Sequence, residues 1–172
     1  EVQEFVDGVS LGALIKRNRP IYGRFLDACG SALFRILDAM AKIGIVHRDL
    51  NPYNLVLTQA GEFRLIDWTF CLKPGGAGEV PVATPGFTAP EQERASSSHA
   101  SDWFSAGATL YFLSNGEAPH SKDATAFTAG LERLTKTGRR LEYDVAGEWR
   151  KGLSTLVSDV LEQDVRKRPI PA

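Results

Sequence analysis

The chain has 172 residues, of which 43% are hydrophobic and 24% are charged, and these values are ordinary for one globular domain with a real core. The formal net charge of -1 gives no general attraction to nucleic acid or to an acidic membrane. No apolar run is long enough to span a bilayer, and the acidic first residues do not resemble a signal peptide. Cys29 and Cys71 lie far apart and have no metal-ligand spacing, so reduced thiols in a cytoplasmic protein are expected.

Two helices are predicted in the first quarter of the chain. Asp7-Gly8 predicts a turn, and Ser10 is a suitable N-cap for a short helix over residues 11–17. Residues 22–43 carry apolar side chains at helical spacing and are followed by Gly44. This pattern is typical of a long core helix with a glycine C-cap.

A β-hairpin is predicted in the next stretch. Residues 55–57 and 63–66 are two short apolar runs, and the four residues between them, Thr-Gln-Ala-Gly, are turn-forming. Such a hairpin fixes the distance between the polar turn over residues 47–54, which precedes it, and Asp67, which follows it.

We therefore expect Asp49, Asn54 and Asp67 to converge on one cavity. Oxygen ligands on two short side chains suit Mg²⁺, which keeps several waters and takes its other ligands from substrate phosphates. A third carboxylate that is not committed to the metal suits a base that accepts a hydroxyl proton. A surface turn rich in Asp and Asn is the alternative interpretation, and the fixed offset of Asn54 and the position of Asp67 at the end of the hairpin argue against it.

The sequence over residues 47–54 is His-Arg-Asp-Leu-Asn-Pro-Tyr-Asn, and Asp67 follows it after the predicted hairpin. Together they resemble the catalytic loop and metal-binding strand of the protein kinase family, H-R-D-L-x-x-x-N followed by D-F-G. The resemblance implies that Asp49 is the catalytic base and that Asn54 and Asp67 bind ATP together with Mg²⁺ or Mn²⁺. It also implies that His47 packs beneath the loop. Asn51 stands where Ser/Thr kinases carry a Lys that steadies the transferred phosphate, so it keeps a donor but loses the charge.

Residues 1–8 resemble the kinase hinge, whose backbone groups bond adenine. By this resemblance Glu4 and Val6 contribute to ATP binding, Gln3 is the gatekeeper, and Val56 on the predicted hairpin lines the same site. An edge strand followed by a short helix is the alternative interpretation of this segment.

Residues 67–91 resemble a kinase activation segment, because they end in Thr-Pro-Gly-Phe-Thr-Ala-Pro-Glu with the A-P-E signature. This element favours a protein substrate over a small molecule. The resemblance implies that Thr84 bonds the catalytic Asp49 and that Glu91 pairs with Arg168 of the later Arg-Pro dipeptide.

The segment departs from the family pattern directly after Asp67, where Trp68 and Thr69 replace Phe and Gly. Threonine lacks the backbone freedom of glycine, so we expect the segment to change conformation less readily. The catalytic-loop Arg48 often pairs with an activating phosphate in such kinases. Thr69 carries the only hydroxyl between Trp68 and residue 83, so we expect no activating phosphate, and Glu79 is a candidate substitute partner for Arg48.

Three further helices are predicted in the second half of the chain. The first begins near Asp102 and continues to residue 113, and Asp102 either bonds the backbone of the catalytic loop, as in kinases, or serves only as a helix-start residue. Residues 123–136 predict an amphipathic helix, and residues 149–163 carry one apolar stripe.

The expected fold is therefore mainly α: a kinase-like C-terminal lobe over residues 1–172 with a small β-hairpin at the catalytic cleft. Its parts are a hinge over 1–8, a catalytic loop and metal strand over 45–69, and an activation segment over 67–91. No Gly-rich loop or strand Lys precedes the hinge-like stretch, so we expect the N-terminal lobe to lie upstream in a parent chain. A naturally truncated protein is the alternative interpretation.

The expected function is ATP-Mg-dependent phosphorylation of Ser or Thr hydroxyls in a protein substrate. The alternative is a pseudokinase that serves as a binding or scaffold module. Retention of Asp49, Asn54 and Asp67 argues for the enzyme, while Asn51 and the Trp68 variant argue for the pseudokinase.

Overall fold

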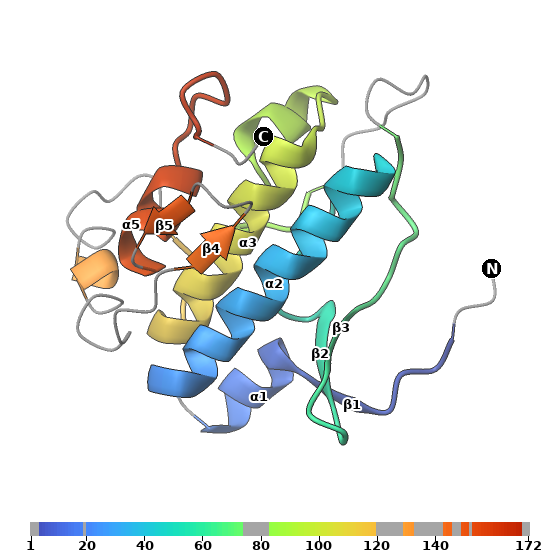
Figure 1. Cartoon of the computed structure of the whole chain (residues 1–172), viewed down its shortest axis with the longest axis vertical. Helices are drawn as coiled ribbons and strands as arrows, with labels where there is room; N and C mark the ends of the chain where they lie inside the picture. Colours follow the sequence, from blue (N-terminus) through green and yellow to red (C-terminus); the bar gives the residue numbers. More distant parts are fainter. Residues whose placement is uncertain are drawn as a thin grey trace.

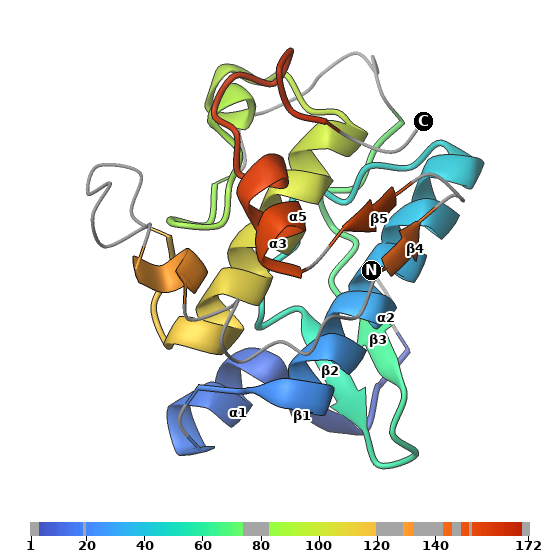
Figure 2. The same ribbon diagram turned by 60° about the vertical axis from the view of Figure 1, so that its left-hand side comes forward.

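The computed structural model describes residues 4–18, 20–73, 83–119, 129–132, 143–145, 149–151 and 153–169. Two long helices, α2 (Gly23–Ile43) and α3 (His99–Asn115), lie side by side (Figure 1). The helix α5 (Leu153–Val160) packs on the other side of α3 (Figure 2). Every residue from 100 to 111 is buried, so α3 is the central helix of the domain. The predicted mainly helical fold is confirmed.

The periodicity of α2 explains how it joins the core. Leu26, Leu33, Leu37 and Met40 recur at helical spacing and are all buried. Phe34 stacks on Trp103 of α3 with ring centroids 5.2 Å apart, an aromatic contact that holds the two helices together. Gly44 ends α2 in the left-handed region at φ 66°, as its sequence position predicts.

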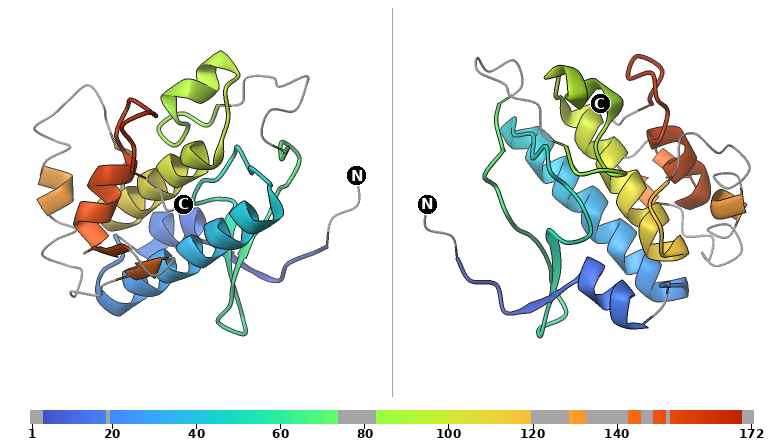
Figure 3. Two further views of the ribbon diagram at one scale, coloured as in Figure 1. Left: turned by 45° about the horizontal axis from the view of Figure 1, so that its top comes forward. Right: turned by 180° about the vertical axis from the view of Figure 1, so that it is seen from behind.

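The small sheet has the order β1-β2-β3 and is antiparallel throughout. The strands β2 (Leu55–Thr58) and β3 (Phe63–Leu65) form the predicted hairpin, and β1 (Gly8–Ser10) pairs with β2 on its other side. The short helix α1 (Leu11–Asn18) follows β1 directly and lies beside β2 (Figure 3). The Ser10 hydroxyl accepts the N–H of Ala13 at 3.3 Å, which is the predicted N-cap.

The predicted helix over 149–163 is wrong at its start. Residues Trp149–Lys151 form the strand β5, which pairs with β4 (Tyr143–Val145), and α5 begins only at Leu153. The apolar stripe from Leu153 onward is helical, but Gly152 separates it from Trp149–Lys151, where pairing with β4 overrides the helical spacing. Of the helix predicted over 123–136, the structure describes only residues 129–132, which are helical.

Of the activation segment predicted over 67–91, the structure describes residues 67–73 and 83–91. The segment ends in the short 3-10 helix η1 (Pro90–Arg94), and α3 begins five residues later with Ser98 as its N-cap. Across the described ranges, no helix has both the length and the apolar character needed to cross a membrane.

Candidate active site

The loop between α2 and β2 is anchored to α3 by one buried carboxylate. Asp102 Oδ2 accepts the backbone N–H of His47 at 2.7 Å, and Asp102 Oδ1 accepts the N–H of Arg48 at 2.9 Å. Asp102 is only 1% exposed, and burial raises its pKa to about 7 although these two N–H bonds oppose the rise. The contact expected between Asp102 and the loop backbone is therefore present.

Arg48 is held in an uncommon backbone conformation. Its φ is 74°, and the backbone carbonyl accepts the side-chain N–H of Gln92 at 2.8 Å. The guanidinium is buried and donates to the Ser97 hydroxyl at 3.1 Å. A non-glycine residue at positive φ costs about 1–3 kcal/mol and persists where its surroundings fix it. Here Asp102 and Gln92 hold the peptide groups on the two sides of Arg48.

Three side-chain donors converge on the carboxylate of Asp49. Asn51 donates its Nδ2 to Asp49 Oδ1 at 3.1 Å, and the Thr84 hydroxyl donates to the same oxygen at 2.5 Å. Asn54 donates its Nδ2 to Asp49 Oδ2 at 3.1 Å. The bond expected between Thr84 and Asp49 is present, although 35 residues separate them. The activation segment therefore reaches the catalytic loop, and the carboxylate of Asp49 is fixed from both sides.

The hairpin brings Asn54 and Asp67 to its open end. Leu55 is paired with Leu65, and the backbone carbonyl of Asn54 accepts the N–H of Ile66 at 2.9 Å. Asp67 follows at a φ of 61°, and its Oδ1 accepts the Thr69 hydroxyl at 2.7 Å. Asn54 directly precedes β2 and Asp67 follows β3, so the two residues lie at the same end of the hairpin, as the sequence predicts.

His47 packs under this segment. Its ring is fully buried, its Nε2 lies 3.1 Å from the carbonyl oxygen of Ile66, and it meets Trp68 edge to face with ring centroids 4.8 Å apart. Burial lowers the pKa of His47 below its ordinary value, so the imidazole is neutral and Nε2 carries the proton that it donates. Trp68 donates its indole N–H to the carbonyl of Leu65 at 3.2 Å, a bond that phenylalanine cannot make.

Glu91 and Arg168 form a buried ion pair far from the loop in sequence. Arg168 Nη1 lies 2.7 Å from Glu91 Oε1, and Arg168 Nη2 lies 3.2 Å from Glu91 Oε2. Burial acts to raise the pKa of Glu91, but hydrogen bonds from Arg168 and Ser101 outweigh it and hold that pKa below its ordinary value. The predicted pairing of these two residues is present.

The chain matches the family described as the protein kinase domain over residues 2–171. It belongs to the protein kinase family. Serine/threonine-protein kinase PknK of Mycobacterium tuberculosis is 34% identical over 165 residues, which cover 93% of this chain and 14% of PknK. A cAMP-dependent protein kinase catalytic subunit-like protein of Caenorhabditis elegans is 26% identical over 170 residues, which cover 97% of this chain and 41% of that protein. Human myotonin-protein kinase is 34% identical over 106 residues, which cover 55% of this chain and 17% of that kinase. This chain thus spans less than half the length of each of these relatives.

The kinase family implies the use of ATP and Mg²⁺, and the oxygen atoms of the site suit that ion. Asn54 and Asp67 offer one amide oxygen and one carboxylate, a small hard-ligand set of the kind that Mg²⁺ uses beside phosphates and water. Among the described residues, no group of three or more His, Cys, Asp or Glu side chains could hold a metal alone. The oxygen ligands of Asn54 and Asp67 therefore suit a cation that binds together with a nucleotide.

The nucleotide-binding residues predicted near the start of the chain are placed only in part. Glu4 and Val6 lie in the irregular stretch before β1, where Glu4 is exposed and Val6 is half-buried. Val56 is buried on β2 and is paired with Ser10 of β1. The sheet thus connects the hinge-like stretch to the hairpin that Asn54 and Asp67 flank. Gln3 and Glu79 lie outside the described residues.

Sequence reasoning missed Gln92 and Ser97, the two side chains that hold Arg48. Gln92 is fully buried, and besides its bond to Arg48 its Oε1 accepts the N–H of Ala89. No spacing rule connects either residue to Arg48, 44 and 49 positions away. Only the polar identity of residues at the start of a buried turn could have suggested them.

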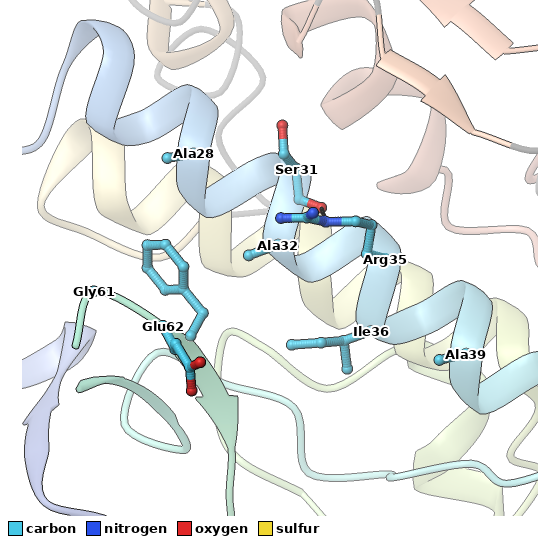
Figure 4. A pocket seen from close by; sticks show the side chains of 9 residues that line it. Ala28, Ser31, Ala32, Arg35, Ile36, Ala39, Gly61 and Glu62 are labelled. Atoms are coloured by element: carbon cyan, nitrogen blue, oxygen red, sulfur yellow. Dashed lines mark hydrogen bonds between the residues drawn. The ribbon is translucent and has the colours of Figure 1, made fainter.

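A separate pocket of about 560 Å³ lies between α2 and the tip of the hairpin (Figure 4). One face of α2, including Ala32 and Ile36, forms one wall, and Glu62 and Phe63 form the other. None of the lining residues belongs to the catalytic loop. This pocket is therefore distinct from the site around Asp49.

Proposed function

We propose that the chain is the catalytic lobe of a Ser/Thr-type protein kinase, which transfers the γ-phosphoryl group of ATP to a Ser or Thr hydroxyl of a protein substrate. The observation that carries this proposal is the convergence of Asn51, Asn54 and Thr84 on the carboxylate of Asp49. Membership of the protein kinase family and similarity to Ser/Thr kinases support it.

In this proposal Asp49 orients the substrate hydroxyl and accepts its proton. The hydroxyl oxygen forms the new bond to phosphorus, the bond between that phosphorus and the oxygen of the departing ADP breaks, and the proton passes to Asp49. Asn54 and Asp67 would hold the magnesium ion, which neutralises charge on the phosphates when it is bound. The neutral His47 and the α3 residue Asp102 would keep the loop in place.

The nucleotide base would rest against the sheet. Backbone groups of Glu4 and Val6 would bond adenine, and Val56 would supply an apolar surface beneath it. Because the chain spans only 14% of PknK and 41% of the Caenorhabditis elegans protein, we propose that an N-terminal lobe in a longer protein completes the ATP site. We also propose a cytoplasmic location, since Cys29 and Cys71 are both free thiols and such thiols stay reduced in the cytosol.

The end of the activation segment supports a protein substrate. Thr84 is bonded to Asp49, and Glu91 at the end of the same segment is paired with Arg168, so hydrogen bonds hold both ends of residues 84–91. An ordered surface beside the base is what an extended polypeptide substrate needs in order to present its hydroxyl.

A pseudokinase that acts as a binding or scaffold module is the second candidate. It is favoured by the buried asparagine that position 51 carries instead of a lysine, and by Trp68 and Thr69 in place of Phe and Gly after Asp67. Such a module would bind partners but transfer little or no phosphate.

The deciding experiment is a radiolabelled ATP assay on the complete encoded protein, with a mixture of Ser- and Thr-containing protein substrates. We expect Mg²⁺-dependent incorporation that falls by several orders of magnitude in Asp49→Asn. Equal incorporation by wild type and Asp49→Asn would remove Asp49 from the mechanism. Absence of incorporation by both would favour the pseudokinase.

A further inference from the structure

The side chain of Asn51 makes four hydrogen bonds within the catalytic loop. Its Oδ1 accepts the backbone N–H of Tyr53 at 2.9 Å and that of Asn54 at 3.2 Å. Its Nδ2 donates to the backbone carbonyl of Asp49 and to Asp49 Oδ1, both at 3.1 Å. A side-chain amide has two N–H groups and two acceptor lone pairs. Asn51 is 4% exposed, so its hydrogen-bonding capacity is fully used inside the loop.

From this geometry we infer that Asn51 is a positioning residue, which closes the loop and orients the Asp49 carboxylate, and that it does not bind the transferred phosphate. The inference rests on the proposed phosphotransfer function. It assigns Asn51 a different task from the phosphate-steadying role that the position suggests.

The chemistry of the loop explains why asparagine suits this task and lysine does not. A lysine ammonium has three donors and no acceptor. Lysine at position 51 would remove the acceptor of the Tyr53 N–H, while the Asn54 N–H would keep the backbone carbonyl of residue 51, which lies 3.1 Å away. An asparagine that caps backbone N–H groups two and three residues ahead forms a local turn of its own. The tight turn from Asp49 to Asn54 is therefore built on the amide of Asn51.

The same bonds define which oxygen of Asp49 can act. Oδ1 accepts from both Asn51 and Thr84, while Oδ2 accepts from Asn54 alone among the described residues. A carboxylate oxygen accepts about two hydrogen bonds. Asp49 Oδ1 is therefore filled, and Oδ2 keeps a lone pair for the substrate hydroxyl. Asn51 contributes to rate by holding this orientation.

Two variants separate the positioning role from phosphate binding. Asn51→Asp keeps an oxygen for the N–H groups of Tyr53 and Asn54, but it replaces the donor that faces Asp49 with a second carboxylate oxygen. Asn51→Lys supplies the positive charge that a phosphate ligand would need, but it removes the acceptor on which the turn depends.

The first measurement is amide hydrogen exchange at Tyr53 and Asn54, which does not require activity. We expect both amides to be protected in wild type and in Asn51→Asp. In Asn51→Lys the Tyr53 amide should exchange at least about tenfold faster because its acceptor is lost, while the Asn54 amide keeps the backbone carbonyl of residue 51 and should change less. Unchanged exchange of the Tyr53 amide in Asn51→Lys would overturn the inference. Thermal unfolding of each variant shows whether the change is confined to the loop.

The second measurement is steady-state kinetics on the complete encoded protein with Mg²⁺-ATP. We expect Asn51→Asp to lower kcat at least about tenfold while KM for ATP stays within about twofold, because orientation of the base is lost and nucleotide binding is not. We expect Asn51→Lys to lower kcat as well. A rise in kcat for Asn51→Lys, or a rise in KM for ATP with unchanged kcat for Asn51→Asp, would show that position 51 serves the phosphate. A wild type without phosphotransfer would refute the proposed function, and the exchange measurement would still decide the role of Asn51.

Discussion

Replacement of Arg168 by methionine tests the buried contact that fastens the end of the chain to the activation segment. The guanidinium donates five hydrogen bonds: two to the Glu91 carboxylate, two to the carbonyl of Glu162 and one to the carbonyl of Ala100. A guanidinium has five N–H donors, so all of them are used. The group also lies 4.9 Å from the ring centre of Phe104.

Methionine fills a similar volume but supplies none of these donors. The Glu91 carboxylate would lose both bonds from the guanidinium and keep that from the Ser101 hydroxyl, and the two carbonyl groups would lose the guanidinium as their donor. Removal of one member of a buried ion pair costs about 3–5 kcal/mol. Since domains are typically stable by about 5–15 kcal/mol, Arg168→Met should remove a large fraction of the free energy of unfolding.

Equilibrium unfolding in urea, followed by tryptophan fluorescence, measures this loss. Trp103 is 3% exposed and stacks on Phe34, so its emission reports the packing of α2 on α3. The matched control is Arg166→Met, two residues away, whose ion pair with Asp164 leaves the arginine side chain 84% exposed. We expect little change there, because exposed pairs contribute little. Equal shifts of the urea midpoint in both variants would refute the reasoning.

The remaining predictions concern Glu91, Gly107 and Trp68. Because its pKa is below the ordinary value of 4.5 in the folded chain, Glu91 stabilises the fold fully above about pH 4.5 and less as pH falls through its folded pKa. The acid-induced loss of stability should therefore be smaller in Glu91→Gln, and an identical acid titration of unfolding would contradict this. A Cβ at Gly107 would overlap Val160 where α3 meets α5, so Gly107→Ala should cost about 1–3 kcal/mol in urea unfolding; unchanged stability would mean that α5 can move away. Trp68→Phe removes the indole bond to Leu65 and should lower stability by about 0.5–1.5 kcal/mol, measurable by the same urea titration; a stability equal to wild type would show that this bond contributes nothing.

Local patterns predicted the elements that depend on local chemistry. The apolar spacing of residues 22–43 and the glycine after them were enough to predict α2, because burial of one face and a left-handed C-cap are both sequence-encoded. The hairpin followed from two short apolar runs and the turn between them. Its position in turn placed Asn54 beside the residue that precedes Asp67.

Contacts between distant residues could not be predicted from such patterns. Glu91 and Arg168 are 77 residues apart, and only the family resemblance connected them. The strand at Trp149–Lys151 was missed because its partner strand β4 decides its conformation, not its own spacing. The positive φ of Arg48 depends on Asp102 and Gln92, which hold its peptide groups from separate elements.

The central proposal is that Asn54 and Asp67 bind one cation together with the nucleotide. Its most direct test is the Mg²⁺ dependence of ATP affinity, measured by calorimetry on the complete encoded protein with Asn54→Ala, Asp67→Ala and the double variant. If both side chains bind the same ion, each single variant should lose most of the Mg²⁺-dependent gain in affinity, and the double variant should lose little more. Wild-type Mg²⁺ dependence in either single variant, or fully additive losses in the double variant, would contradict the shared site.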